Sequence, residues 1–507
     1  MLRVALPPFV RHRFRPPAVP SRRPILLPST ARAGAWSALA WLLFVAIPAA
    51  CAQGVGEKID RVLGKLPGGI SAGVLVVDLE SDAVVYERNA DRALLTASNT
   101  KLVTTAAAIE RLGADFAYTT EVYTDEKPTS PVLAGRVVLV GSGDPCFSGR
   151  FFDGDPARVL GLWADALAKQ GVTKISGGVV LDASAIAGPA VHPDWPKDQL
   201  DEWYSAPVDA FNLNDNCLEI VLRAGRSGKL VECAAIPDGA FPRLANRCAT
   251  SSNGTHKPLV HFPPDDPGGP VVSGVFRSDH AEARYLWTAR DPSDLFARTF
   301  ADHLRRRGID PGAVTVSRVS VTPGGTLFAR HRSPLERVIG PINKKSQNLF
   351  AECLFHALGR AGGGPGSFAS GKIAVEAYLA SIGATGQVAD GSGLSRTNAY
   401  PPRTLVTILS RMWKAPTRDL FVASLPIAGV DGSLDSRMED APAKGNVFAK
   451  TGYIRSVSAL SGYARTRSGK MLAFSMLFNG FAEVDVSNLT LKRDVQDAIC
   501  QLLAGMP

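Results

Sequence analysis

A β-rich middle segment constrains the fold of this chain more than any other feature of its sequence. Residues 119–300 contain short apolar runs separated by Gly, Pro and Asp, which is typical of strands joined by turns. Before this segment, residues 71–86 alternate like a pair of strands, and a helix is expected from about Ser98 to Leu112. After it, helices and strands return. This order predicts one α/β domain that is split by an insertion.

The second half of the split domain is expected to contain helices and late strands. Helical periodicity covers residues 293–306, 346–360, 367–382, 403–413 and 488–504. Alternating apolar residues predict strands at 446–450, 457–464 and 470–478.

The chain has 507 residues, which is more than one hydrophobic core needs, so several domains are expected. We expect a leader over residues 1–52 and the first part of the split domain over 53–118. The insertion is expected over 119–295, and residues 296–507 complete the split domain.

The positive charge of the chain is concentrated in the leader. The whole sequence has a formal net charge of +9, and residues 1–52 contain seven Arg and no Asp, Glu or Lys. The remaining 49 Lys and Arg residues face 47 Asp and Glu residues, a net charge of +2. Phosphate binding needs basic charge on the folded part, so we expect no nucleic-acid partner.

The leader has the order of a secretory signal. Arginines precede an apolar run over residues 34–47, and Ala50-Cys51-Ala52 supplies a small-residue cleavage site. We expect cleavage after Ala52 and a periplasmic protein that is at most loosely associated with membrane or wall. A retained membrane anchor is the alternative. Lipidation at Cys51 is disfavoured because Pro48 stands where such signals usually carry Leu.

Six of the seven cysteines lie after Cys51, an even number in an exported chain. Cys233 and Cys248 lie close together in a Pro/Gly-rich stretch and are predicted to form a disulfide. The sequence contains no C-x-x-C pair and no H-E-x-x-H motif. We therefore expect neither a metal nor a cofactor.

Ser98 and Lys101 form the first motif that carries chemistry. Their spacing at a helix start places both side chains on one face, one turn apart. A serine hydroxyl is a weak nucleophile until a base removes its proton, and a lysine is such a base only when neutral. The helix start also supplies free N–H groups for a developing oxyanion. Taken alone, the pair is more readily explained as a capping serine and a surface lysine.

Two further short motifs follow in the second half. Ser346-Gln347-Asn348 is an S-x-N motif, a pattern that also occurs at residues 251–253. Lys450-Thr451-Gly452 follows a predicted strand. A lysine on a strand edge can hold a substrate carboxylate and lower the pKa of Lys101, while Gly452 permits close approach of the backbone.

Together and in this order, S-x-x-K, S-x-N and K-T-G resemble the serine β-lactamase/transpeptidase superfamily. More narrowly, the chain resembles the D-alanyl-D-alanine carboxypeptidases/endopeptidases among the class C low-molecular-mass penicillin-binding proteins, peptidase family S13. The similarity runs from about residue 57 to 505. It is carried by residues 141–145, 182–184, 204–207, 214–217, 344–348, 390–398 and 428–434. One departure is Gln347, where many relatives have Asp.

This resemblance implies a fold in which an antiparallel sheet is flanked by helices. It also implies large domains nested between the first two motifs, which agrees with the 248 residues that separate Ser98 from Ser346. The implied substrates are peptidoglycan stem peptides, and β-lactams are implied as covalent inhibitors.

The resemblance also implies a role for each motif residue. Ser98 would be the acyl-ester nucleophile and Lys101 its proton acceptor. Ser346 would pass a proton to the leaving amine, and Asn348 would orient Lys101 and the substrate amide. Lys450 and Thr451 would bind the terminal carboxylate of the substrate, beside Gly452. The backbone N–H groups of Ser98 and Tyr453 would form the oxyanion hole.

Two more residues are candidates for specificity. Arg396 is a fixed cation that can pair with a side-chain carboxylate of the stem peptide, such as that of diaminopimelate. Asp182 can take the amino group of that side chain. Their structural alternatives are a salt bridge and a strand-end cap. Trp195 and Tyr204 either line the cleft or belong to the core.

Two rival functions remain open at this stage. One is a β-lactamase or esterase on the same scaffold. The other is a catalytically silent wall-binding protein whose inserted domains matter more than the site. Neither the balance of carboxypeptidase and endopeptidase activity nor the oligomeric state follows from the sequence.

Overall fold

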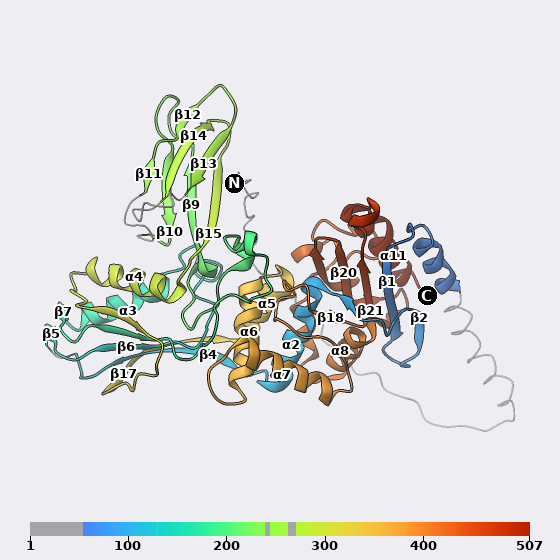
Figure 1. Cartoon of the computed structure of the whole chain (residues 1–507), viewed down its shortest axis with the longest axis horizontal. Helices are drawn as coiled ribbons and strands as arrows, with labels where there is room; N and C mark the ends of the chain where they lie inside the picture. Colours follow the sequence, from blue (N-terminus) through green and yellow to red (C-terminus); the bar gives the residue numbers. More distant parts are fainter. Residues whose placement is uncertain (1–53, 129, 239–243, 262–269) are drawn as a thin grey trace, which may run out of the picture.

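The computed structural model describes residues 54–128, 130–238, 244–261 and 270–507. The chain forms two lobes, and a small β-rich module projects from one of them (Figure 1). The predicted leader, with its cleavage after Ala52 and the question of lipidation at Cys51, lies outside the described residues. Among the described residues, no helix combines the length and apolar character that crossing a membrane requires.

One lobe is built on a five-stranded antiparallel sheet that combines both ends of the described chain. Its strand order is β19-β20-β21-β1-β2, so β1 pairs with β2 on one side and with β21 on the other. Early strands (blue) and late strands (red) therefore lie side by side (Figure 1). The strands are β1 (Ser71–Asp78), β2 (Val84–Arg88), β19 (Val447–Ile454), β20 (Val457–Arg465) and β21 (Met471–Asn479).

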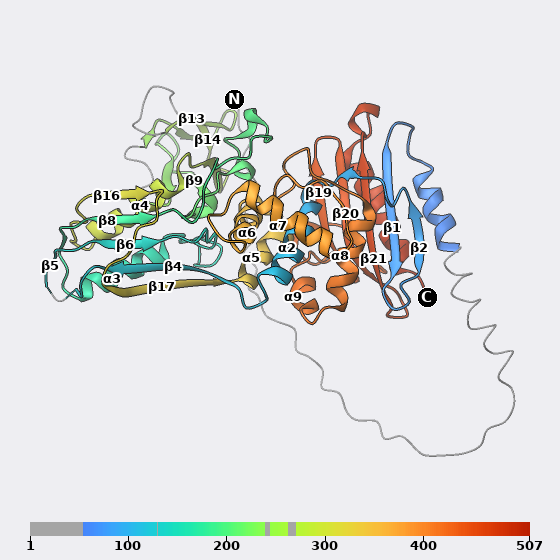
Figure 2. The ribbon, with the colours of Figure 1, turned by 60° about the horizontal axis from the view of Figure 1, so that its bottom comes forward.

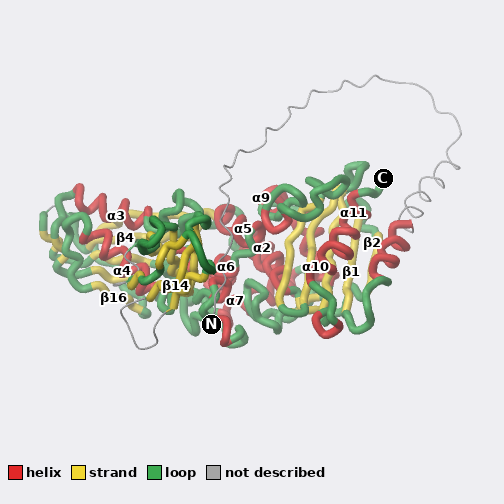
Figure 3. Tube along the Cα trace, turned by 90° about the horizontal axis from the view of Figure 1, so that it is seen from above, coloured by secondary structure: helices red, strands yellow, loops and turns green. Residues whose placement is uncertain are grey.

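Hydrophobic cores cover both faces of this sheet, because its central strands carry apolar side chains on both faces. Leu75 belongs to one core, and its neighbours Val74 and Val76 belong to the other, as the two-residue period of a strand requires. β20 and β21 are buried along almost their whole length. This part of the chain is therefore a three-layer arrangement with helices on both sides of the sheet (Figure 3).

Helix α2 (Thr100–Arg111) is the centre of the first core. Ten of its twelve residues are buried, which is the signature of a helix enclosed on all sides. The helices of this core are α5 (Leu335–Lys344), α6 (Asn348–Arg360), α7 (Phe368–Ser381), α8 (Pro402–Lys414) and α9 (Arg418–Ala423). The opposite face is covered by a helix over residues 54–63, α10 (Asn488–Thr490), η7 (Leu491–Asp497) and α11 (Ala498–Ala504).

The other lobe is the inserted part, built on a mixed sheet of order β16-β8-β6-β4-β17 (Figure 2). β6 and β8 are parallel, and such a pair needs a crossover, which contains α3. No helix was predicted at these positions. The elements are β4 (Ala117–Thr124), β6 (Val137–Val140), β8 (Val179–Asp182), β16 (Val314–Ser317), β17 (Thr326–Pro334), α3 (Arg158–Lys169) and α4 (Pro292–Arg305). In this lobe the short strands β5 (Val132–Leu133) and β7 (Lys174–Ile175) also pair. A second short pair, β3 (Leu94–Leu95) with β18 (Ala399–Tyr400), belongs to the first lobe.

The inserted sheet extends beyond the expected range of 119–295. Its strand β4 begins at Ala117, and β17 ends at Pro334, directly before α5. The reason is that β17 pairs antiparallel with β4, so the chain leaves the inserted sheet beside the strand by which it entered. Helix α4 consequently packs on the inserted sheet instead of beginning the second part of the split domain.

The small module consists of two sheets around a core of its own. Its strands are β9 (Cys217–Arg223), β10 (Glu232–Ile236), β11 (Ala245–Asn246), β12 (Ala249–Ser251), β13 (Lys257–His261), β14 (Val271–Arg277) and β15 (Glu282–Thr288). Cys248 lies in this core and Cys233 packs against it. The predicted disulfide between them is nevertheless not formed, because all six cysteines of the described residues are free thiols. The α/β class, with an antiparallel sheet, flanking helices and β-rich nested domains, is confirmed.

Candidate active site

Ser98 lies in a short 3-10 turn, η1 (Ala97–Asn99), directly before the central helix α2. Ala97 has a φ of 46°, a left-handed conformation that is uncommon for a residue with a side chain. Two glycines allow other segments to pack against this turn. A Cβ on Gly393 would lie 1.9 Å from the carbonyl oxygen of Ala97, and a Cβ on Gly452 would lie 2.7 Å from that of Thr96. The turn is thus enclosed between two neighbouring segments.

Lys101 lies one turn further along and points at Ser98. Its Nζ is 3.0 Å from Ser98 Oγ, and it also donates to Asn348 Oδ1 and to the carbonyl oxygen of Ser392, both at 2.7 Å. The side chain is fully buried. This burial lowers the pKa of Lys101 to about 7, against the opposing effect of the carboxylates of Glu352 and Asp390. A lysine in this state can accept a proton near neutral pH.

Ser346 and Lys450 form the second pair of the site. Lys450 Nζ donates to Ser346 Oγ at 2.9 Å and to the carbonyl oxygen of Thr451 at 2.8 Å. Burial and the neighbouring charge of Lys101 hold the pKa of Lys450 well below its usual range. An anion arriving beside Lys450 would offset both effects and favour its protonated form.

Asn348 connects the two halves of the site. Its Oδ1 accepts from Lys101, and its Nδ2 donates to the carbonyl oxygen of Tyr204 at 2.7 Å. Tyr204 belongs to the inserted part, so this lobe contacts the active site directly. Tyr204 was a candidate through its ring, whereas its backbone oxygen makes this contact.

The K-T-G motif lies on β19, which is an edge strand of the sheet. Ile454 pairs with Val457 across a two-residue turn, which makes them a hydrogen-bonded pair. Hydrogen-bonded and non-hydrogen-bonded pairs alternate along an antiparallel ladder, so Tyr453 and Thr451 occupy non-hydrogen-bonded positions. Their N–H groups therefore point away from β20. Thr451 Oγ1 is hydrogen-bonded to Ser433 Oγ at 2.8 Å. Tyr453 is 55% exposed, so its backbone and ring lie at the surface of this edge.

The loop over residues 390–398 supports the site from behind, and sequence reasoning did not assign it this role. Asp390 is buried and accepts hydrogen bonds from Trp195 Nε1 at 2.8 Å, Asn398 Nδ2 at 2.8 Å and the N–H of Gly393 at 2.7 Å. This network positions the loop whose Ser392 carbonyl binds Lys101. Trp195 therefore belongs to the core beneath the site.

Glu352 of α6 was also missed. Its carboxylate accepts from the N–H groups of Gly391 and Ser392 at 2.9 and 2.8 Å. Burial and the charge of Asp390 raise the pKa of Glu352 to about 8. No local motif marks such a residue, because its role depends on a loop that follows some 40 positions later.

The two specificity candidates lie in different surroundings. Arg396 is exposed and donates to the carbonyl oxygen of Arg455, beside the turn that ends β19. Asp182 is buried at the end of β8, where it accepts from the N–H groups of Ser184 and Val321 at 2.9 and 2.8 Å. Asp182 thus acts as the strand-end cap that was its structural alternative.

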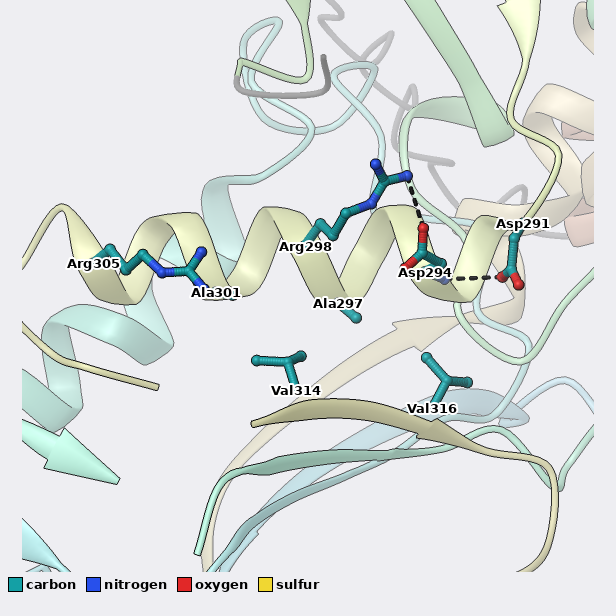
Figure 4. A pocket seen from close by; sticks show the side chains of 8 residues that line it. All are labelled: Asp291, Asp294, Ala297, Arg298, Ala301, Arg305, Val314 and Val316. Carbon is teal, nitrogen blue, oxygen red and sulfur yellow. Dashed lines mark hydrogen bonds and ion pairs between the residues drawn. The ribbon is translucent and has the colours of Figure 1, made fainter. Parts of the chain in front are cut away.

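A pocket of about 290 Å³ lies elsewhere, between α4 and β16 of the inserted part (Figure 4). It is lined by Asp291, Asp294, Ala297, Arg298, Ala301, Arg305, Val314 and Val316, and none of these is a predicted site residue. The part of the chain that the structure describes contains no cluster of three or more His, Cys, Asp or Glu side chains suited to a metal ion.

The fold and the paired Ser–Lys contacts define a serine acyl-transfer enzyme of the β-lactamase/transpeptidase superfamily. The chain belongs to the D-Ala-D-Ala carboxypeptidase 3 (S13) family, which it matches over residues 55–505. The predicted family and enzyme class are confirmed, and the chain is a serine-type D-Ala-D-Ala carboxypeptidase.

The chain is similar to individual relatives over most of their length. The chain is 32% identical to a D-alanyl-D-alanine carboxypeptidase from Actinomadura sp. (strain R39), covering 88% of this chain and 84% of that protein. It is 28% identical to D-alanyl-D-alanine carboxypeptidase DacB from Haemophilus influenzae, covering 85% of this chain and 90% of that protein. The crystal structure of penicillin binding protein 4 (dacB) from H. influenzae superposes with a TM-score of 0.71 at 27% identity, covering 88% of this chain and 97% of that one.

Proposed function

We propose that the enzyme cleaves the terminal D-Ala-D-Ala bond of peptidoglycan stem peptides through an acyl-enzyme on Ser98. The observation that carries this proposal is the 3.0 Å contact between Ser98 Oγ and the fully buried amine of Lys101. The neutral amine accepts the proton of Ser98 as Oγ attacks the carbonyl carbon of the penultimate D-Ala. The outward N–H of Tyr453, together with that of Ser98, stabilises the resulting oxyanion.

The leaving group needs a proton, and Ser346 is placed to supply it. Lys450 Nζ donates to Ser346 Oγ at 2.9 Å, so the proton of the Ser346 hydroxyl can go to the departing amine of D-Ala. The proton taken up by Lys101 then replaces it. The C–N bond breaks and the acyl ester on Ser98 remains. Water then attacks this ester, releases the shortened peptide as a carboxylate and regenerates the serine.

The terminal carboxylate of the substrate binds at Lys450 and Thr451. Its negative charge raises the pKa of Lys450, and the cation so formed favours the neutral form of Lys101. Substrate binding therefore prepares the base. The same arrangement acts on a cross-link whose acyl donor is a D-Ala residue, so the proposal includes DD-endopeptidase activity.

β-Lactams are proposed to acylate the same serine. A structure of the H. influenzae protein in complex with a β-lactam has a TM-score of 0.67 to this chain at 26% identity, covering 88% of this chain and 98% of that one. The ring-opened acyl group remains attached to Ser98, where the β-lactam carboxylate occupies the place of the peptide carboxylate.

A labelled penicillin tests the mechanism. We expect one adduct by intact mass, mapped by digestion to the peptide that contains Ser98, and none on Ser98→Ala. Hydrolysis of a D-Ala-D-Ala peptide by Ser98→Ala would overturn the proposal. Rapid release of the penicilloyl group would instead assign the chain to the β-lactamases, and absence of any adduct on the wild type would favour a silent binding protein.

We also propose that the enzyme is exported to the periplasm and associates at most loosely with membrane or wall. The basic leader and the near-neutral remainder of the chain support this location. Cell fractionation and N-terminal sequencing of the mature protein test it. A mature protein that begins at residue 53 is expected, and a chain that retains the leader in the cytoplasm would contradict the proposal.

A further inference from the structure

We infer that Asp215, on the inserted part, is a positioning residue that holds the Ser346 loop in its active conformation through Gln347. This deepens the proposed function and rests on Ser346 acting as the proton donor. Asp215 Oδ2 accepts a hydrogen bond from Gln347 Nε2 at 2.9 Å, across 132 residues of sequence. Gln347 stands between the two reactive members of the S-x-N motif and is 2% exposed.

Ser346 requires support, because its backbone has a φ of 58°. This left-handed conformation is disfavoured for a residue with a side chain, so surrounding contacts must hold it. On the preceding side, Lys344 forms an ion pair with Asp431 at 2.5 Å. On the following side, the side chain of Gln347 reaches Asp215. The loop is therefore fixed at both ends around the reactive hydroxyl.

Asp215 lies in a turn whose backbone is strained and is held by side-chain hydrogen bonds. Residues 214–216 have three consecutive positive φ angles of 52°, 56° and 52°. The side chain of Asn216 fixes this turn by donating to the carbonyl oxygen of Pro207 at 2.7 Å and accepting from the N–H of Leu213 at 3.0 Å. Such a turn presents the carboxylate of Asp215 in a single direction.

Two further side chains orient that carboxylate. Arg150 donates to Asp215 Oδ2 at 2.6 and 3.0 Å, and Ser148 Oγ donates to Oδ1 at 3.0 Å. The carboxylate accepts from Gln347 as a third partner. Asp215 thus transmits the position of the inserted lobe to the S-x-N loop, while touching neither Ser346 nor the reacting atoms.

The pair explains why this chain has Gln at the middle of the motif. The amide of Gln347 adds a further donor to the carboxylate of Asp215, beside Arg150 and Ser148. An acidic side chain at position 347 would place two carboxylates against each other in a buried contact, which disfavours the charged form of both. Gln347 of the catalytic lobe and Asp215 of the inserted lobe are therefore complementary, the first as hydrogen-bond donor and the second as acceptor.

A charge-inversion series tests this inference. Gln347→Glu keeps the size of the side chain and places a carboxylate against Asp215. Asp215→Asn keeps a side chain that tolerates the left-handed conformation and can donate to Glu at 347. Asp165→Asn is the matched control, because Asp165 forms a comparable bidentate pair with Arg307 in the inserted lobe. Each variant is mixed with labelled penicillin to separate the acylation rate constant from the dissociation constant of the initial complex.

We expect Gln347→Glu to lower the acylation rate constant by about 30-fold, as a displaced catalytic group would, with the initial dissociation constant changed less than about threefold. The double variant should return to within about fivefold of wild type, because the hydrogen bond is restored with reversed polarity. Asp165→Asn should acylate like wild type.

Three results would overturn the inference: acylation of Gln347→Glu at the wild-type rate, a double variant no better than Gln347→Glu, or an equal loss in Asp165→Asn. If Gln347→Glu is recovered unfolded, the soluble double variant decides the question by acylating or failing to acylate. Wild-type protein that forms no adduct would contradict the proposed function instead, so the two failures are distinguishable.

Discussion

The amine of Lys101 lies 3.0 Å from the hydroxyl oxygen of Ser98, and protein encloses the lysine side chain completely. This contact makes the protonation state of one buried group decisive for the first chemical step. It also makes that step measurable through its dependence on pH.

The second-order rate constant of acylation, which reports the free enzyme, should depend on pH with a midpoint near the lowered pKa of Lys101, about 7. The neutral amine is the base, so the rate constant rises as pH rises through this value and falls about tenfold per unit well below it. Stopped-flow acylation by a labelled penicillin between pH 5 and 9 measures the profile. Lys101→Arg should be inactive throughout, because a guanidinium does not lose its proton in this range. A flat wild-type profile would contradict the assignment.

Gly393→Ala should destabilise the protein and impair acylation. The new Cβ would lie 1.9 Å from the carbonyl oxygen of Ala97, at a φ of 81°. Displacing the nucleophile turn and adopting this φ should cost about 3 kcal/mol in the free energy of unfolding. Gly363→Ala is the control, because Gly363 has a φ of 94° and no atom within 4 Å of its added Cβ. Its expected cost is about 1 kcal/mol, with normal acylation. Urea unfolding of both variants tests the difference.

Trp195→Phe should weaken the support behind Lys101. It removes the donor that lies 2.8 Å from Asp390, which leaves a buried carboxylate with one partner fewer. We expect a loss of about 2 kcal/mol in unfolding free energy and slower acylation. Trp163→Phe also removes volume from a buried position, in the core of the inserted lobe. It should lower stability while leaving the acylation rate of the folded protein unchanged, and equal acylation by both variants would argue against a role for the Asp390 loop.

Arg396→Ala should change the choice of substrate. Arg396 is exposed beside the end of β19, with one nitrogen on the carbonyl oxygen of Arg455. For a stem peptide with a carboxylate on the side chain of its third residue, kcat/KM should fall about tenfold, the effect of one lost charge-assisted hydrogen bond. A peptide without that carboxylate should be cleaved as before. Arg403→Ala is the control, because Arg403 lies in α8 and pairs with Asp91, and it should cleave both peptides like the wild type. Equal losses on the two peptides would remove Arg396 from the recognition of that group.

The sequence was most informative where chemistry depends on local geometry. The spacing of Ser98 and Lys101 already requires one helix face, and the structure places their reactive atoms in contact. The pairing of Ser346 with Lys450 is different, because these residues are 104 positions apart in the sequence and meet only in the folded chain. Resemblance to a family assigned both residues to one site, with separate roles, whereas their hydrogen bond was not predicted.

Residues that act through distant partners escaped prediction for a physical reason. Asp390 and Asp215 lie in stretches that carry the family resemblance, but their roles, like that of Glu352, are defined by the backbone or side chain that each meets in the folded chain. Cys233 and Cys248 show the opposite error. Proximity in a Pro/Gly-rich stretch of sequence suggested a bond, yet both remain thiols.

The position of β19 at the edge of its sheet has a broader consequence. An unpaired strand edge normally recruits other chains and invites aggregation. The N–H groups of Thr451 and Tyr453 face away from β20, so we expect this part of the edge to accept an extended peptide that carries the carbonyl attacked by Ser98. On this expectation each cleavage would release the added strand, so that substrate is held by transient strand addition, a reaction that other sheets must avoid.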